Sequence, residues 1–208
     1  MPPPADVLAF VRAALPAPPA RVLEIGAGAG DLARALADAG HDVTAIDPAA
    51  TEGGTVEPVA LLDVPDPAAP FDAAVAVLSL HHVEPLGASC AHLARLVRAG
   101  GVLAVDEFDI EAFDERAAGW WVAQRGVLGR HAPAVEELRS DLAEHVHPLR
   151  DVVAALAPWF ALGEPVRGPY LHRFELHPAL RPFEEALIAE GVIPAVGARL
   201  AGLRRPEA

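Results

Sequence analysis

Short apolar runs alternate with helical patterns through the first half of the chain. The runs have the length and flanking turn residues of buried strands, which we expect at residues 21–25, 42–46, 58–62, 72–80 and 101–108. Apolar residues at helical spacing predict helices at residues 5–15, 31–39 and 88–97. This alternation is typical of a parallel sheet whose two faces are covered by helices.

The second half of the chain is less regular. Helical spacing predicts helices at residues 115–128, 135–147, 149–156 and 182–190. Residues 161–176 have an extended pattern, and a last strand is expected at residues 196–203. We expect these extended segments to pair antiparallel and to close one edge of the sheet.

A glycine-rich loop lies between the first predicted strand and the helix that follows it. The sequence VLEIGAGAGDLARAL places Gly26, Gly28 and Gly30 in this loop. Glycine accepts positive φ angles and lets a ligand touch the backbone. A glycine-rich loop between a buried strand and a helix indicates a nucleoside-type binding site, although structural turns also use glycine.

The residue after the third glycine helps to choose between ligands. A dinucleotide fingerprint has glycines at its first, third and sixth positions and places a pyrophosphate at the helix N-terminus. Counted from Gly26, the sixth position is Asp31, which we expect to cap the helix and to put a negative charge there. The sequence therefore disfavours a ligand that carries phosphate.

Two carboxylates stand near the ends of the first two predicted strands. Glu24 is expected to point into the cleft at the carboxyl edge of the sheet, unless it is only a solvated charge at the strand edge. Asp47 ends the second strand, where a carboxylate accepts hydrogen bonds from both hydroxyls of a ribose. The alternative for Asp47 is an ordinary turn aspartate before Pro48.

Three segments in this order resemble class I S-adenosylmethionine-dependent methyltransferases. Residues 22–48 resemble motif I and the next strand, residues 59–83 the third and fourth strands, and residues 93–108 the helix, glycine turn and fifth strand. The resemblance spans residues 21–108 and implies S-adenosyl-L-methionine as the cofactor. It also implies an α/β fold, a Rossmann-like three-layer sandwich around a mostly parallel seven-stranded sheet with an antiparallel edge strand.

The resemblance also implies a set of cofactor-binding residues. They are Glu24, Gly26, Ala27, Gly28, Gly30, Asp47, Pro48, Asp63, Val64, Ser79, Leu80 and His81. Among these, Asp47 would hold the ribose and Asp63 would lie near the adenine amino group. Asp63 follows Asp47 by only 16 positions, so the second helix of the family is short or missing here.

Two adjacent histidines are the candidates for catalysis. Methyl transfer is an in-line displacement, so a general base is needed only when the nucleophile arrives protonated. His81 and His82 follow the fourth predicted strand and titrate near neutral pH, but one could instead pack beneath the cofactor while the other caps a turn. The segment lacks the Asn/Asp-Pro-Pro-Tyr motif of enzymes that methylate base amines, which favours a small-molecule acceptor.

Polar residues after the fifth predicted strand are candidates for an acceptor pocket. An acidic rim there would suit a cationic or amine-bearing acceptor, whereas the plain alternative is a solvated loop with core tryptophans. The residues concerned are Asp106, Glu107, Asp109, Trp120 and Trp121, with a second ambiguous cluster at Tyr170, His172 and Arg173.

Length, charge and cysteine content bound the remaining possibilities. A chain of 208 residues suits one domain, divided into a lead-in (1–20), a cofactor half (21–108) and an acceptor side (109–208). Its net charge of −13 disfavours nucleic-acid partners. No membrane span or signal segment is recognised, and the lone Cys90 excludes an internal disulfide framework, so we expect a cytoplasmic monomer or homodimer.

Two other functions compete with small-molecule methyl transfer. The shortened second helix favours a catalytically silent methyltransferase-like binding module. An NAD-dependent oxidoreductase is disfavoured by Asp31. No metal site is expected, because His145 and His147 are two positions apart and lie on different faces of a helix.

Overall fold

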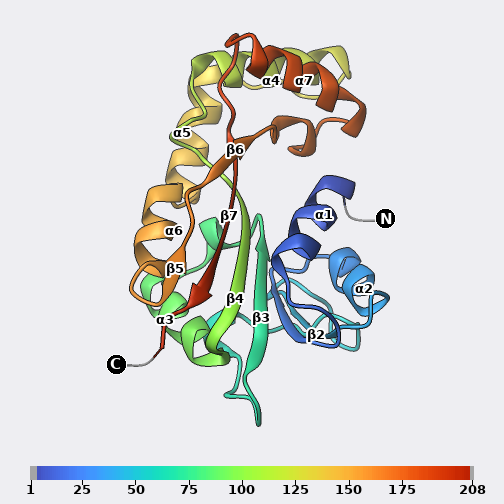
Figure 1. The fold of residues 1–208 in the computed structure, drawn as a ribbon. Helices are drawn as coiled ribbons and strands as arrows, with labels where there is room; N and C mark the ends of the chain where they lie inside the picture. Colours follow the sequence, from blue (N-terminus) through green and yellow to red (C-terminus); the bar gives the residue numbers. More distant parts are fainter. Residues whose placement is uncertain (1–3, 207–208) are drawn as a thin grey trace.

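Seven strands form one mixed sheet in the computed structural model, which describes residues 4–206 (Figure 1). The strands are β1 (Arg21–Ile25), β2 (Asp42–Ile46), β3 (Phe71–Val77), β4 (Val97–Phe108), β5 (Phe160–Leu162), β6 (Val166–Gly168) and β7 (Gly197–Arg204). Their order is β2-β1-β3-β4-β7-β5, with β6 also paired to β7. The first four are parallel neighbours and β7 runs antiparallel to β4, β5 and β6, which confirms the mostly parallel sheet with an antiparallel edge.

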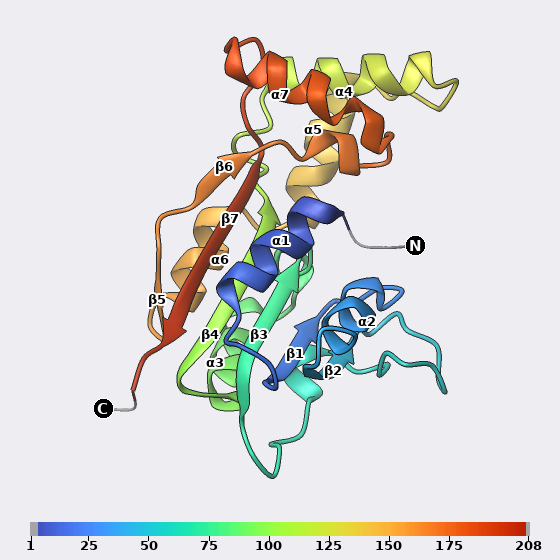
Figure 2. The same cartoon turned by 45° about the vertical axis from the view of Figure 1, so that its right-hand side comes forward.

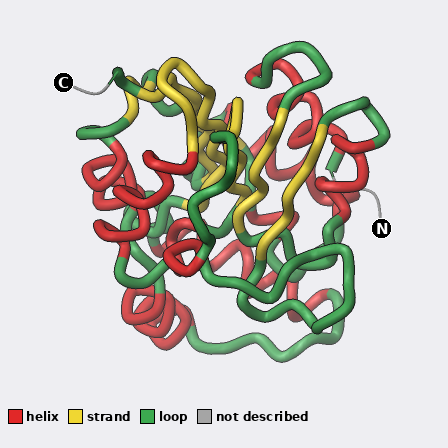
Figure 3. The backbone as a smooth tube through the Cα atoms, turned by 90° about the horizontal axis from the view of Figure 1, so that it is seen from below, coloured by secondary structure: helices red, strands yellow, loops and turns green. Residues whose placement is uncertain are grey.

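Helices cover both faces of the sheet and make it the middle of three layers (Figures 2 and 3). On one face, α1 (Ala5–Ala14) and α2 (Asp31–Ala37) bury Val7, Val11 and Leu36 against the sheet. On the other face, α3 (Leu86–Leu96) and α6 (Leu149–Leu156) bury Leu93 and Val152. Because β1 and β3 are covered on both faces, most of their residues are buried.

A helical cap lies beyond one end of the sheet (Figure 1). It consists of α4 (Glu115–Val127), α5 (Val135–His145) and α7 (Arg181–Ala189). The Asp114 carboxylate starts α4 by accepting hydrogen bonds from the N–H groups of Arg116 and Ala117. The cap has its own aromatic core around Phe108 and Trp121, so Trp121 is a core residue.

The third predicted strand is wrong. Residues 58–62 make no strand, and the residue before them, Glu57, pairs with the sheet through an isolated bridge to Ile46. Pro58 has no N–H with which to extend that bridge. The chain turns instead into the short 3-10 helix η1 (Leu61–Asp63). The 14 residues from Asp47 to Ala60 are all described and contain no helix, as the short spacing predicted.

Other boundaries differ from the sequence predictions for local reasons. The strand predicted at residues 72–80 ends at Val77, because Leu78 takes a φ of 55° and a 3-10 helix, η2 (Leu80–His82), follows. The extended segment at 161–176 is interrupted after β6 by η3 (Leu171–Arg173). Within residues 4–206, no helix is both long and apolar enough to cross a membrane.

Candidate functional site

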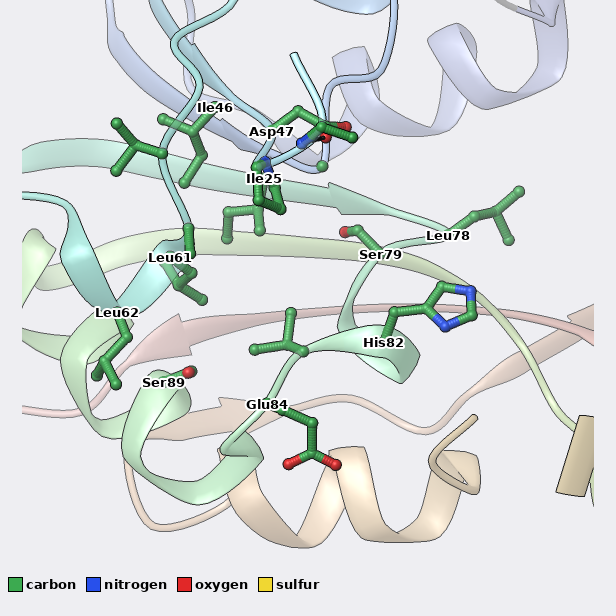
Figure 4. Close-up of a pocket in the computed structure, with 16 residues that line it drawn as sticks. Ile25, Ile46, Asp47, Leu61, Leu62, Leu78, Ser79, His82, Glu84 and Ser89 are labelled. Carbon is green, nitrogen blue, oxygen red and sulfur yellow. Dashed lines mark hydrogen bonds between the residues drawn. The ribbon is translucent and has the colours of Figure 1, made fainter. Parts of the chain in front are cut away.

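A cavity of about 490 Å³ opens where β1, β2 and β3 end (Figure 4). Ile25 and Gly26 border it from β1, Ile46 and Asp47 from β2, and Ser79 from the loop after β3. Ligands of open parallel sheets bind at this edge, and the volume lies in the range of small-molecule sites. The remaining lining residues are Pro48, Ala49, Val59, Ala60, Leu61, Leu62, Leu78, His82, Val83, Glu84 and Ser89.

The glycine loop forms one wall because its backbone approaches the loop after β3 closely. Gly26 has a φ of 69°, and a Cβ built on it would lie 2.3 Å from the Cβ of Ser79. Any side chain at position 26 would therefore push the two loops apart. The space beside Gly28 is open, since a Cβ there would meet no atom within 4 Å.

Asp47 is held in place by the loop it faces. Its Oδ2 accepts a hydrogen bond from the N–H of Gly28 at 2.8 Å, and its Oδ1 accepts one from Ala49 at 2.8 Å. Each carboxylate oxygen has lone pairs for a further hydrogen bond. Asp47 is therefore pre-positioned at the cavity with capacity for two more donors.

The other end of the cavity is apolar except for one hydroxyl. Ile46, Val59, Leu61 and Leu62 line it, and Ser89 of α3 places its side chain among them. Figure 4 shows Leu61, Leu62 and Ser89 on the side of the cavity away from Leu78 and His82. An apolar end of this kind suits a flat aromatic group.

A buried carboxylate holds the loop after β3. Glu107 of β4 is completely buried, and its Oε1 accepts hydrogen bonds from the N–H groups of Ser79 (3.1 Å) and Leu80 (2.7 Å). Its Oε2 bonds Nδ1 of His81, which is itself 6% exposed. Glu107 therefore positions the loop that forms the cavity wall.

The two candidate histidines have different surroundings. His82 lines the cavity, whereas His81 is turned away from it toward Glu107. Partial burial, followed by the neighbouring His81 ring, lowers the pKa of His82, which favours the neutral imidazole at pH 7. Of the two, only His82 has its side chain placed to take a proton in the cavity.

The remaining residues expected to bind a cofactor fall into two groups. Gly26, Asp47, Pro48 and Ser79 line the cavity, whereas the others contribute no lining atoms. Those others are Glu24, Ala27, Gly28, Gly30, Asp63, Val64, Leu80 and His81.

Three of the residues outside the lining have clear physical reasons for being there. Glu24 is 3% exposed and lies on the same face of β1 as Val22, toward α2, rather than pointing into the cleft; burial raises its pKa to about 7. Asp63 is exposed at the end of η1. The carbonyl of Val64 accepts a hydrogen bond from Nε2 of His92 at 2.7 Å.

The helix cap also differs from expectation. The left-handed Gly30 is the N-cap of α2, and Asp31 is its first residue, where its carboxylate pairs with Arg34. The negative charge still lies in the first turn, where it disfavours a pyrophosphate.

The expected acidic rim does not line the cavity. Asp106 is 2% exposed and is paired with Arg173 (3.2 Å) and Arg199 (2.9 Å). Asp109 is paired with Arg167. These carboxylates are neutralised within the fold, so they supply no acidic surface for an acceptor. Within residues 4–206, no group of three or more His, Cys, Asp or Glu side chains is arranged to hold a metal ion.

Sequence reasoning missed Ser89 and the apolar residues beside it. Val59 and Leu62 come from the segment predicted as the third strand, and Ser89 comes from α3, in which no site residue was predicted. Only the packing of α3 beside η1 brings Ser89 to the cavity, and no local motif signals that packing.

Known proteins were compared with the sequence and the fold. A family model described as a methyltransferase domain matches residues 4–155. An uncharacterized methyltransferase of Staphylococcus carnosus is 30% identical over 145 residues, which cover 64% of this chain and 67% of that protein.

Two solved structures have similar folds at low sequence identity. The N-methyltransferase NodS of Bradyrhizobium japonicum, in complex with S-adenosylhomocysteine, is 17% identical with a TM-score of 0.59, over 97% of this chain and 86% of that one. The 1,6-didemethyltoxoflavin-N1-methyltransferase of Burkholderia thailandensis, with 1,6-didemethyltoxoflavin and S-adenosylhomocysteine bound, is 18% identical with a TM-score of 0.57, over 97% of this chain and 78% of that one. With a family match over most of its length and a cavity at the carboxyl edge of the sheet, the chain belongs to the methyltransferase domain family.

Proposed function

We propose that the protein binds S-adenosyl-L-methionine in this cavity and transfers its methyl group to a small-molecule acceptor. The observation that carries the proposal is Asp47, whose carboxylate is held at the cavity wall by Gly28 and Ala49 with room for two more hydrogen bonds. Two ribose hydroxyls match that capacity. The related folds described with S-adenosylhomocysteine support the same ligand.

The rest of the cavity fits the other parts of this donor. The apolar end formed by Ile46, Leu61 and Leu62 suits an adenine ring. The glycine wall at Gly26, which borders the cavity, suits a group that lies against backbone, such as the amino-acid portion. When bound, the donor supplies a sulfonium methyl group that a nucleophile displaces in line.

The protein positions the donor and the acceptor, excludes water from them and supplies a proton acceptor. Glu107 holds the Ser79 loop, and the Gly26 wall sets how near the two loops lie. Such positioning is worth about 7–11 kcal/mol in effective-molarity terms. We assign His82 as the residue that takes a proton when the acceptor arrives protonated, and His81 as a positioning residue held by Glu107.

A small-molecule acceptor is favoured over a nucleic acid. The net charge of −13 repels a phosphate backbone, and the Ser79 to His82 segment lacks the motif of enzymes that act on base amines. The Burkholderia thailandensis enzyme, which has a similar fold, is described with 1,6-didemethyltoxoflavin bound.

Calorimetry with S-adenosylhomocysteine tests donor binding. Wild-type protein is expected to bind, and Asp47→Asn is expected to bind about 10- to 100-fold more weakly, because one oxygen that accepts from a hydroxyl is lost. Asp63→Asn is the matched control, since its carboxylate is exposed outside the cavity, and its affinity should stay within 2-fold of wild type. Absence of binding by wild-type protein would refute the proposal.

A binding module without turnover is the second candidate, favoured by the absence of a helix between Asp47 and Leu61. Turnover over a panel of amine, phenol and quinone-like acceptors distinguishes the two. We expect S-adenosylhomocysteine to form with at least one acceptor. With a phenolic acceptor, His82→Gln should lower kcat by about 100-fold or more and change donor affinity far less, because it removes the proton acceptor but keeps a polar side chain at the cavity wall. Donor binding without product across the panel would favour the silent module.

A further inference from the structure

Ser89 is a buried hydroxyl with no partner inside the protein. The residue is 0% exposed, and within residues 4–206 its Oγ contacts no hydrogen-bonding atom. Leaving a buried polar group unpaired is unfavourable, so such groups call for an explanation. The explanation available here is that Ser89 lines the cavity, where a ligand can supply the missing bond.

The position of Ser89 on α3 places it at the apolar end of the cavity. Ser89 lies one helical turn before His92, and residues three apart share a face of a helix. His92 bonds the carbonyl of Val64, directly after η1, so this face of α3 packs against the segment that carries Leu61 and Leu62. Figure 4 shows the Ser89 oxygen directed into the cavity beside these leucines.

The residue that the family resemblance would place at this end is not available. Asp63 is exposed and contributes nothing to the lining. Among the lining residues at this end, only Ser89 combines a buried side chain with free hydrogen-bonding capacity. A hydroxyl both donates and accepts, so it can pair with an amino group or with a ring nitrogen.

We infer that the Ser89 hydroxyl, rather than a carboxylate at position 63, makes the side-chain hydrogen bond to the purine edge of the donor. The inference rests on the proposed function, because it takes the ligand to be an adenosyl compound. It assigns purine recognition to helix α3, in which the sequence predicted no cofactor-binding residue.

Calorimetry on Ser89→Ala tests the inference with two probes, S-adenosylhomocysteine and 5′-methylthioadenosine. The second probe keeps the purine and ribose but lacks the amino-acid portion. Loss of one hydrogen bond to the purine should weaken both probes equally, by about 5-fold. Because the Oγ has no partner inside the protein, the ligand-free Tm of Ser89→Ala should be unchanged or higher. Ser140→Ala, at an exposed position of α5, is the matched control and should leave all values unchanged.

The other possible outcomes would contradict either the role of Ser89 or the proposed function itself. If wild-type protein binds S-adenosylhomocysteine and Ser89→Ala binds it within 1.5-fold, the inference fails and the proposed function stands. A penalty seen with S-adenosylhomocysteine but not with 5′-methylthioadenosine would move Ser89 away from the purine and also overturn the inference. A ligand-free Tm more than 3 °C below wild type would show that the hydroxyl has a structural bond. If wild-type protein binds neither probe, the proposed function and the inference fall together.

Discussion

Two short turns in this protein are held by similar hydrogen bonds to a buried glutamate but lie in different surroundings. In the first, Glu107 accepts from the N–H groups of Ser79 and Leu80 and bonds Nδ1 of His81. In the second, Glu184 of α7 accepts from the N–H groups of Tyr170 (2.7 Å) and Leu171 (2.8 Å) and bonds Nδ1 of His172 at 2.7 Å. Both glutamates are 0% exposed, and both turns are 3-10 helices that begin with Leu-His.

The difference between the turns lies in what they border. The first turn places Ser79 and His82 at the cavity. The second belongs to the core of the cap, where Tyr170 stacks on Phe108 with ring centroids 4.9 Å apart. No residue from 170 to 173 lines the cavity. A buried carboxylate–histidine pair is therefore not in itself a sign of function; its place in the fold decides.

The largest effect is expected when either glutamate is removed. Glu107→Ala leaves a histidine and two backbone N–H groups without their acceptor, and Glu184→Ala leaves a histidine and three. Breaking a buried pair of this kind costs about 3–5 kcal/mol of unfolding free energy, to be measured by urea denaturation. Glu185→Ala, beside Glu184 on α7 but in a partly exposed pair with Arg181, should cost less than about 1 kcal/mol. A loss below about 1 kcal/mol for either buried glutamate would contradict the claim that both glutamates stabilise the fold.

Glu24 is a third buried glutamate, and it differs from Glu107 and Glu184 because few hydrogen-bond donors surround its carboxylate. Burial, with a further contribution from Asp31, raises the pKa of Glu24 to about 7. For Glu184, burial is outweighed by the His172 side chain and three backbone N–H groups, so the pKa of Glu184 is lowered. Ionised Glu24 is thus disfavoured in the folded protein, whereas ionised Glu184 is favoured.

The opposite pKa directions predict opposite pH dependences. Between pH 4.5 and about 7, Glu24 is ionised in the unfolded protein but still protonated in the folded protein. Glu24 therefore lowers the free energy of unfolding progressively as pH rises through this range. At 1.36 kcal/mol per pKa unit, the loss of unfolding free energy amounts to about 3 kcal/mol, and Glu24→Gln should remove this pH-dependent loss. The contribution of Glu184 is instead lost as pH falls through its lowered pKa. Urea denaturation of wild type and Glu24→Gln at pH 5 and pH 7 measures the Glu24 effect, and identical pH profiles for the two proteins would contradict it. The Glu184 effect requires measurements below pH 4.5, because the pKa of Glu184 is lowered from that value.

The smallest expected effect is on ligand affinity, which should fall when the Glu107 turn is altered but not when the Glu184 turn is altered. Glu107→Gln keeps the shape of the side chain but replaces one acceptor oxygen with a donor, so the cavity loop should shift. We expect about 10-fold weaker binding of S-adenosylhomocysteine, which corresponds to 1.4 kcal/mol. Glu184→Gln is the matched control and should change the Kd by less than 2-fold. Equal losses in the two variants would show that the turns do not differ in function.

The central sheet could be predicted from the sequence because its strands are buried on both faces. Residues 21–25 and 42–46 were predicted to the residue, as was the helix at 149–156. The third strand failed at Pro58, which interrupts pairing after one bridge. The long extended segment before α7 failed because η3 is held by Glu184, a side chain more than ten positions further along the chain.

The site could be predicted only where it is local in sequence. Gly26, Asp47 and Ser79 sit at strand ends, and strand ends can be found from the apolar pattern. Glu107 was expected at an acceptor rim, but it bonds backbone groups 27 and 28 positions earlier, a pairing that only the sheet register creates. Ser89 reaches the cavity through helix packing, which has no signature in a single sequence.

A crystal structure of the protein grown with S-adenosylhomocysteine would show where the donor binds. We expect ligand density in the cavity at the ends of β1, β2 and β3, with both ribose hydroxyls on the Asp47 carboxylate and the purine between Leu61 and Ser89. Ligand density elsewhere, or a ribose that does not contact Asp47, would contradict this expectation.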